Sequence, residues 1–209
     1  MIVAIPKEIN ALETRVAATP GSIKDLIKSG MEVQVESKAG IKSFITDQDY
    51  KDAGAKVIDS VTELYSKADI IIKVLPLAEK ESSFISEVSV FISLCQTTRE
   101  TQQVKVLQDK SVTGFSMHLI PRTTLAQKMD ALSSQANIAG YKAVLLAATR
   151  LGVYMPLLMT AAGTIRPAKI LILGAGVAGL QAIATAKRLG AQVEAFDVRP
   201  IVKEQVESL

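Results

Sequence analysis

The chain has 209 residues, of which 48% are hydrophobic and 22% are charged, and its net charge is +3. This composition excludes an intrinsically disordered protein, which would be poor in apolar residues and rich in charge. No block of five or six like charges marks a nucleic-acid surface, so we expect no nucleic-acid partner. At about 150 residues per domain, the length corresponds to about 1.4 domains.

The single cysteine, Cys95, and the single histidine, His118, restrict the chemistry that the chain can perform. One cysteine cannot form an internal disulfide, which suits a reducing compartment. The two residues cannot supply the roughly four ligands of a zinc site, so we expect no metal. Arg150 and Pro156 interrupt the longest apolar region, near residues 143–162, which therefore predicts a buried helix and not a membrane span.

Short β-rich runs alternate with helical patterns in the first part of the chain. The expected strands cover residues 2–5, 32–36, 69–75, 89–94 and 111–115. The expected helices cover residues 21–29, 47–53, 61–67 and 98–109. Near-continuous apolar strands that alternate with helices are typical of a parallel sheet covered on both faces. Pro20 before the first helix and Gly30 after it agree with the usual positions of these residues at helix ends.

The periodicity changes at Leu125. Apolar residues then recur at alternating steps of four and three, at Leu125, Met129, Leu132, Ala136, Ala139, Ala143 and Leu146. This spacing predicts the apolar stripe of a long amphipathic helix that connects two domains. Gly140, inside the pattern, either weakens the helix or marks close packing.

A second α/β unit follows this helix. The buried strand 169–173 leads into Gly174-Ala-Gly-Val-Ala-Gly179, then a helix to residue 189 and a second strand over 192–196. The predicted fold class is therefore α/β, with two Rossmann-like parallel-sheet domains joined by a long helix and the second domain incomplete. We expect an N-terminal domain over 1–124, a connector over 125–165 and the first βαβ unit of a truncated domain over 166–209.

The glycine loop is the strongest functional signal. Gly174 permits a tight turn after the strand, Gly176 leaves room for a pyrophosphate and Gly179 allows close packing of the helix on the strand. Asp197 ends the next strand, 18 residues beyond Gly179, near the spacing of an acid that binds ribose. A carboxylate there favours NAD over NADP. Arg199 follows two residues later and could complicate that preference, but its position favours an ordinary solvent-exposed arginine.

Two further polar groups are candidates on weaker grounds. Arg122, Gln127, Asp130 and Ser133 precede or open the long helix and could hold a carboxamide, although helix capping would explain them as well. Acidic and basic residues also cluster near the expected strand ends of the first domain, at Lys7, Glu8, Glu13, Arg15 and Lys73. Such side chains often lie in the cleft of an α/β fold, but surface ion pairs would give the same pattern.

Three segments carry a family resemblance. Residues 1–20 resemble the opening of the alanine dehydrogenase and nicotinamide nucleotide transhydrogenase superfamily. Residues 129–143 (MDALSSQANIAGYKA) look specifically like the transhydrogenase branch, as do residues 174–191 with the following Phe-Asp-Val-Arg-Pro. The chain therefore resembles the NAD(H)-binding N-terminal part of a transhydrogenase alpha subunit.

This resemblance implies a cofactor site. It implies that Arg122, Gln127, Asp130 and Ser133 surround the nicotinamide of NAD(H). It also implies that the glycine loop with Val177 holds the pyrophosphate, and that Asp197 holds the adenosine ribose, with Arg199 beside it. No side chain is expected to act as acid or base in the hydride step, because the protein's task is to orient the cofactor and exclude water.

The resemblance also implies partners and a location. Hydride would pass from NADH to NADP⁺ on a partner domain, coupled to proton movement through a membrane domain. We expect a homodimer at the cytoplasmic side of a bacterial inner membrane, or at the matrix side in a mitochondrion. The 209 residues alone are not expected to be active.

Two alternatives stay open at this point. An alanine dehydrogenase resembles the chain at Arg15 and Lys73, but it uses a histidine after the strand at 90–94, where this chain has Leu94-Cys95-Gln96. A non-catalytic dimerisation module is the second alternative, because a two-stranded parallel unit buries little apolar surface.

Overall fold

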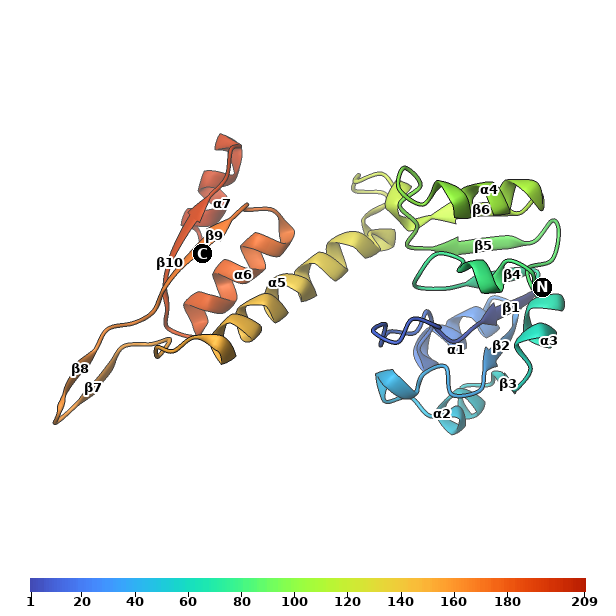
Figure 1. Cartoon of the computed structure of the whole chain (residues 1–209), viewed down its shortest axis with the longest axis horizontal. Coiled ribbons are helices and arrows are strands. Elements are labelled where there is room, and N and C mark those ends of the chain that lie inside the picture. The colour runs from blue at the N-terminus through green and yellow to red at the C-terminus, as the bar shows by residue number, and fades with distance from the viewer. The chain divides into compact units, whose positions relative to one another are not determined.

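The computed structural model describes residues 1–209, and their packing divides them into two units, Met1–Met129 and Asp130–Leu209. In Figure 1 the first unit runs from blue to yellow-green and the second from yellow to red. The α/β class with Rossmann-like parallel sheets is confirmed.

The first unit contains a six-stranded parallel sheet with the order β3-β2-β1-β4-β5-β6. The strands are β1 (Ile2–Ile5), β2 (Glu32–Glu36), β3 (Lys56–Ile58), β4 (Ile70–Ile72), β5 (Val90–Ser93) and β6 (Thr113–Ser116). This is the strand order of a doubly wound fold, whose direction of winding reverses between β1 and β4. Strand β3 was not predicted, because three residues with an exposed Lys56 are too few to show a strand pattern.

Four helices accompany this sheet: α1 (Pro20–Lys28), α2 (Asp47–Asp52), α3 (Val61–Ser66) and α4 (Thr101–Asp109). Two buried clusters form the core of the unit. Val3 and Ile5 belong to one cluster, whereas Ala4 belongs to the other. Because neighbouring side chains of a strand point to opposite faces, this alternation shows that both faces of the sheet are covered, as the apolar runs predict.

The second unit begins with the long helix α5 (Ala131–Arg150) and contains the βαβ unit formed by β9 (Lys169–Leu173), α6 (Val177–Arg188) and β10 (Gln192–Phe196). Strands β9 and β10 pair in parallel. An antiparallel hairpin, β7 (Leu158–Thr160) and β8 (Gly163–Ile165), was not predicted and extends away from the β9–β10 pair (Figure 1). The short helix α7 (Lys203–Glu207) follows β10.

The predicted start of the long helix is wrong. Leu125 precedes the helix and is 95% exposed, and Met129 belongs to a separate short 3-10 helix, Gln127–Met129. The side chain of Asp130 accepts a hydrogen bond from Ser133 N and so begins α5 at Ala131. The buried face of α5 is also different from the predicted stripe, because Gly140 and Val144 are buried while Ala139 and Ala143 are exposed.

Gly140 marks a close contact between α5 and α6. A Cβ atom at this position would lie 2.0 Å from the Ala178 carbonyl oxygen. Asn137 Nδ2 also donates to Gln181 Oε1 across the two helices, at 3.0 Å. Glycine therefore permits the backbone of α6 to approach α5 at its first turn.

No helix in the structure combines the length and the apolar character that crossing a bilayer requires.

Candidate functional site

The glycine loop connects β9 to the N-terminus of α6. Gly174 has φ +96°, which only glycine adopts without strain. A Cβ atom at Gly179 would lie 1.8 Å from the Gly174 carbonyl oxygen, so the loop and the helix can close only around a glycine. Gly176 is the N-cap of α6 and contributes no side-chain hydrogen bond. A helix start of this kind offers backbone N–H groups and a positive dipole end to an anion.

Asp197 lies directly after β10 and ties the end of that strand to the glycine loop. Its Oδ2 accepts hydrogen bonds from Ala175 N at 2.7 Å and from Arg199 Nη2 at 2.9 Å. Its Oδ1 accepts from Arg199 N at 2.8 Å and from Arg199 Nε at 3.0 Å. The hydrogen bonds from the Arg199 side chain, followed by those from the two backbone N–H groups, lower the pKa of Asp197 well below its usual range. The carboxylate is therefore ionised and fixed beside the loop.

The residues of this site fit a dinucleotide. A cavity of about 370 Å³ lies at the carboxyl end of β10 and is lined by Ala175, Asp197 and Arg199, among others. Around the ideal Cβ position of Gly176, the nearest atom is Arg199 Nη2 at 4.0 Å, so the backbone of this residue is open to a close ligand. A pyrophosphate can approach this backbone, and a ribose can approach the acidic end of β10.

The four residues expected at the nicotinamide fall in different units. Arg122 and Gln127 are exposed near the end of the first unit, whereas Asp130 and Ser133 open α5 in the second unit. Ser133 donates to Asp130 through its backbone N at 2.9 Å and through its Oγ at 2.6 Å. Asp130 and Ser133 therefore cap α5, and a role for all four residues at the nicotinamide stays a prediction.

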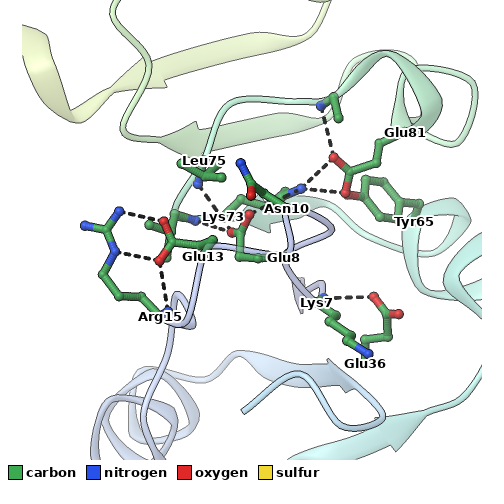
Figure 2. Close-up of polar contacts among 12 residues, drawn as sticks. Lys7, Glu8, Asn10, Glu13, Arg15, Glu36, Tyr65, Lys73, Leu75 and Glu81 are labelled. Atoms are coloured by element: carbon green, nitrogen blue, oxygen red, sulfur yellow. Dashed lines mark hydrogen bonds and ion pairs between the residues drawn. The ribbon is translucent and has the colours of Figure 1, made fainter. Parts of the chain in front are cut away.

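The first unit carries a buried charged cluster where its sheet reverses direction. Glu8 follows β1 and Lys73 follows β4, and Lys73 Nζ lies 2.5 Å from Glu81 Oε1 and 3.7 Å from Glu8 Oε2. Tyr65 OH donates to the same Glu81 oxygen at 2.9 Å (Figure 2). Ligands of open α/β sheets bind at this edge of the sheet. In this unit, Glu8 and Lys73 line a cavity of about 310 Å³ at that edge.

Burial governs the charge of this cluster. Glu8 is 6% exposed, and its Oε1 accepts from Val74 N at 2.7 Å. Burial raises the pKa of Glu8, while Lys73 and the backbone hydrogen bonds act in the opposite direction. Burial also raises the pKa of Tyr65, as does the neighbouring Glu81. Our prediction included Glu8 and Lys73 but missed Glu81 and Tyr65, because no motif connects residues that come together only through the fold.

The other residues of the N-terminal cluster are paired locally. Arg15 donates from Nε and Nη2 to the two carboxylate oxygens of Glu13, at 2.8 and 2.7 Å. The backbone N of Lys7 donates to Glu36 Oε2 at 2.8 Å (Figure 2). The first unit also lacks a glycine loop after β1, where Pro6-Lys7-Glu8 stands instead. The dinucleotide signature is therefore confined to the second unit.

Comparisons with known proteins identify relatives along the whole chain. An NAD(P) transhydrogenase subunit alpha protein from Rhodospirillum rubrum is 45% identical over 100% of this chain and 56% of the relative. A crystal structure of transhydrogenase from Sinorhizobium meliloti has a TM-score of 0.95 at 47% identity, with 100% of this chain and 62% of that chain covered. An L-alanine dehydrogenase structure has a TM-score of 0.89 at 27% identity, with 100% and 58% covered.

These relatives are longer than this chain, which spans about half of the Rhodospirillum rubrum protein. The family match covers both units. The N-terminal domain of the alanine dehydrogenase/PNT family matches residues 4–139, and its C-terminal domain matches residues 143–209. The fold, the glycine loop and these matches agree, and the chain belongs to the alanine dehydrogenase/PNT family.

Proposed function

We propose that the chain is the NAD(H)-binding part of a proton-translocating NAD(P) transhydrogenase. The observation that carries this proposal is the glycine loop closed by Asp197, in a chain that is 45% identical to a transhydrogenase subunit alpha protein. Bound NAD(H) would supply the hydride chemistry. NADP(H) would bind to a partner domain, and hydride would pass directly between NAD(H) and NADP(H).

The residues of the chain then bind and orient the cofactor. The first turn of α6, with Gly176, Val177 and Gly179, holds the pyrophosphate through backbone N–H groups. Asp197 accepts from the adenosine ribose, and the backbone N–H groups of Ala175 and Arg199 fix its carboxylate. We assign Arg122, Gln127, Asp130 and Ser133 to the nicotinamide, where arginine and glutamine donate to the carboxamide. A fixed nicotinamide raises the rate of transfer, because the reacting atoms are held at the required distance.

The wider assembly belongs to the same proposal. We propose NADP(H)-binding and membrane domains as partners, a homodimer, and a location at the cytoplasmic side of a bacterial inner membrane or the matrix side of a mitochondrial one. We also propose the functional division into 1–124, 125–165 and 166–209.

A transfer experiment tests this function. A full-length subunit that contains this chain is mixed with its NADP(H)-binding partner, and reduction of an NAD⁺ analogue by NADPH is followed spectroscopically. We expect transfer that needs both proteins, and we expect Asp197→Ala to weaken binding of the NAD⁺ analogue by about ten- to hundredfold, the scale of a lost charged hydrogen bond. No transfer between two folded partners would contradict the proposal.

Alanine dehydrogenation is a second candidate, because the chain places Arg15 and Lys73 near the carboxyl edge of the first sheet and is similar to an L-alanine dehydrogenase structure. Against it stands Leu94-Cys95-Gln96 after β5, where no histidine is present. Cys95 stands at this place, and burial, together with a hydrogen bond to Glu100, raises the pKa of its thiol to about 11. Addition of alanine and NAD⁺ distinguishes the candidates, since only an alanine dehydrogenase would produce NADH.

A further inference from the structure

We propose that cofactor choice is set by the Asp197–Arg199 pair and not by Asp197 alone, with Arg199 a cation that the carboxylate keeps from binding a 2′-phosphate. This inference rests on the proposed function, because it assumes that an adenosine ribose lies at the end of β10. It assigns a specificity-determining role to an arginine that the sequence alone favours as an ordinary surface residue.

Asp197 accepts hydrogen bonds at both of its carboxylate oxygens. Each carboxylate oxygen accepts one bond from a backbone N–H and one from the Arg199 side chain. The guanidinium binds in the bidentate manner that arginine also uses for phosphate. Nε and Nη2 of Arg199 therefore donate to the carboxylate while Asp197 is ionised.

The two side chains of the pair differ in their exposure to solvent. The Asp197 side chain is 8% exposed, whereas the Arg199 side chain is 56% exposed. The backbone N–H groups of Ala175 and Arg199 hold the carboxylate in place. A ribose hydroxyl can therefore reach the carboxylate by displacing the exposed guanidinium, and the hydroxyl donates the hydrogen bond that the guanidinium gives up.

A 2′-phosphate cannot interact with the pair as a ribose hydroxyl does. Such a group brings about two negative charges and no donor, so it cannot replace the guanidinium on Asp197, and the carboxylate repels it. If the carboxylate is removed, the Arg199 guanidinium loses its partner. It stays in the wall of the same cavity, with Nη2 near Gly176. The pair thus contains two groups that favour different cofactors. The Asp197 carboxylate accepts from a hydroxyl, and the Arg199 guanidinium could donate to a phosphate but is bound to the carboxylate.

The experiment compares two ligands that lack the nicotinamide, ADP-ribose and 2′-phospho-ADP-ribose, by calorimetric titration of the full chain. We expect the wild type to bind ADP-ribose at least about tenfold more tightly than it binds 2′-phospho-ADP-ribose. We expect Asp197→Ala to bind 2′-phospho-ADP-ribose at least about tenfold more tightly than the wild type does. Adding Arg199→Gln to that variant should abolish the gain.

Lys203→Gln in the Asp197→Ala background is the matched control, because Lys203 lines the same cavity but pairs with Glu207. This variant should keep the gain. If the circular dichroism spectrum shows that Asp197→Ala is not folded, Asp197→Ser is used instead, since the serine hydroxyl can still accept from Ala175 N.

The outcomes separate the two claims. No gain in the Asp197 variant, or an equal gain without Arg199, overturns the specificity role of the pair. Failure of the folded wild type to bind ADP-ribose counts against the proposed function instead.

Discussion

The surroundings of two carboxyl groups, Asp197 and Glu8, shift their pKa values in opposite directions. At Asp197, hydrogen bonds from Arg199 and from the backbone lower the pKa and keep the carboxylate ionised. At Glu8, burial outweighs the nearby Lys73 and raises the pKa. The first carboxylate lies beside the glycine loop, whereas the second lies in a buried cluster with Lys73 and Glu81.

The raised pKa of Glu8 predicts a pH-dependent stability. A carboxyl group whose folded pKa lies above its unfolded value of 4.5 binds more protons in the folded state. Its contribution to the free energy of unfolding is therefore complete below pH 4.5 and is lost as the pH rises through the folded pKa. We expect Glu8→Gln to remove this loss, so that the variant gains stability relative to the wild type as the pH rises above 4.5. Urea denaturation at several pH values measures the difference.

Glu13→Gln is the matched control for that measurement. The hydrogen bond from Arg15 lowers the pKa of Glu13, so its contribution is present above pH 4.5 and is lost as the pH falls through the folded pKa. The two variants should therefore differ from the wild type with opposite pH slopes. A Glu8→Gln difference that does not change with pH would contradict the assigned cause.

At the scale of elements, the α5–α6 contact positions the glycine loop. The ideal Cβ of Gly140 would lie 2.0 Å from the Ala178 carbonyl oxygen, in the first turn of the helix that we propose holds the pyrophosphate. The same two helices are joined by the bond from Asn137 to Gln181. The connector thus supports the start of α6 directly.

We predict that Gly140→Ala destabilises the second unit by about 1–3 kcal/mol, the usual cost of overpacking. Because α6 must shift, binding of ADP-ribose should weaken as well. Gly152→Ala is the control, since nothing lies within 4 Å of its Cβ position. Thermal unfolding and calorimetric titration measure both effects. Equal behaviour of the two variants would show that the close approach of α6 to α5 has no energetic role.

The sequence predicts elements best where local patterns suffice. The apolar runs of β1, β2 and β9 and the ends of α1 follow from side-chain periodicity and from Pro20 and Gly30. Strand β3 and the β7–β8 hairpin, with three residues in each strand, were missed. The predicted start of the long helix at Leu125 was wrong for another reason. Apolar spacing does not reveal that Asp130 caps the helix.

The candidate site shows the same division. The glycine loop and Asp197 form a local motif of known spacing, and the structure brings them into contact. The pairing of Asp197 with Arg199 depends on side-chain directions that spacing does not report. Glu81 and Tyr65 join Lys73 only because a short 3-10 helix, Glu79–Glu81, and α3 pack near the end of β4.

At the scale of the whole molecule, the two units differ in how well their sheets are covered. The first unit buries both faces of β1 within a six-stranded sheet. In the second unit, Leu171 is 60% and Leu173 is 74% exposed on the two-stranded β9–β10 sheet. Sheets of two strands are marginal without further cover. The second unit should therefore be the less stable of the two.

Hydrogen exchange followed by mass spectrometry tests this difference within one chain. We predict that amides of β1 and β4 exchange more slowly than those of β9 and β10, because local opening costs less where few apolar contacts are lost. ADP-ribose should slow exchange in the glycine loop and α6 and leave β1 unchanged. Faster exchange in β1 than in β9 would contradict the assigned order of stability.

The central claim is that this chain binds NAD(H) through the second unit, and direct titration with NADH tests it. Fluorescence titration of the full chain should show saturable binding of NADH that is at least about tenfold tighter than binding of NADPH, since a carboxylate at the end of this strand would accept from a 2′-hydroxyl and repel a 2′-phosphate. Gly179→Val should abolish the binding, because its side chain cannot fit beside the Gly174 carbonyl oxygen. A folded chain that binds neither nucleotide, or that binds NADPH as tightly as NADH, would contradict the account.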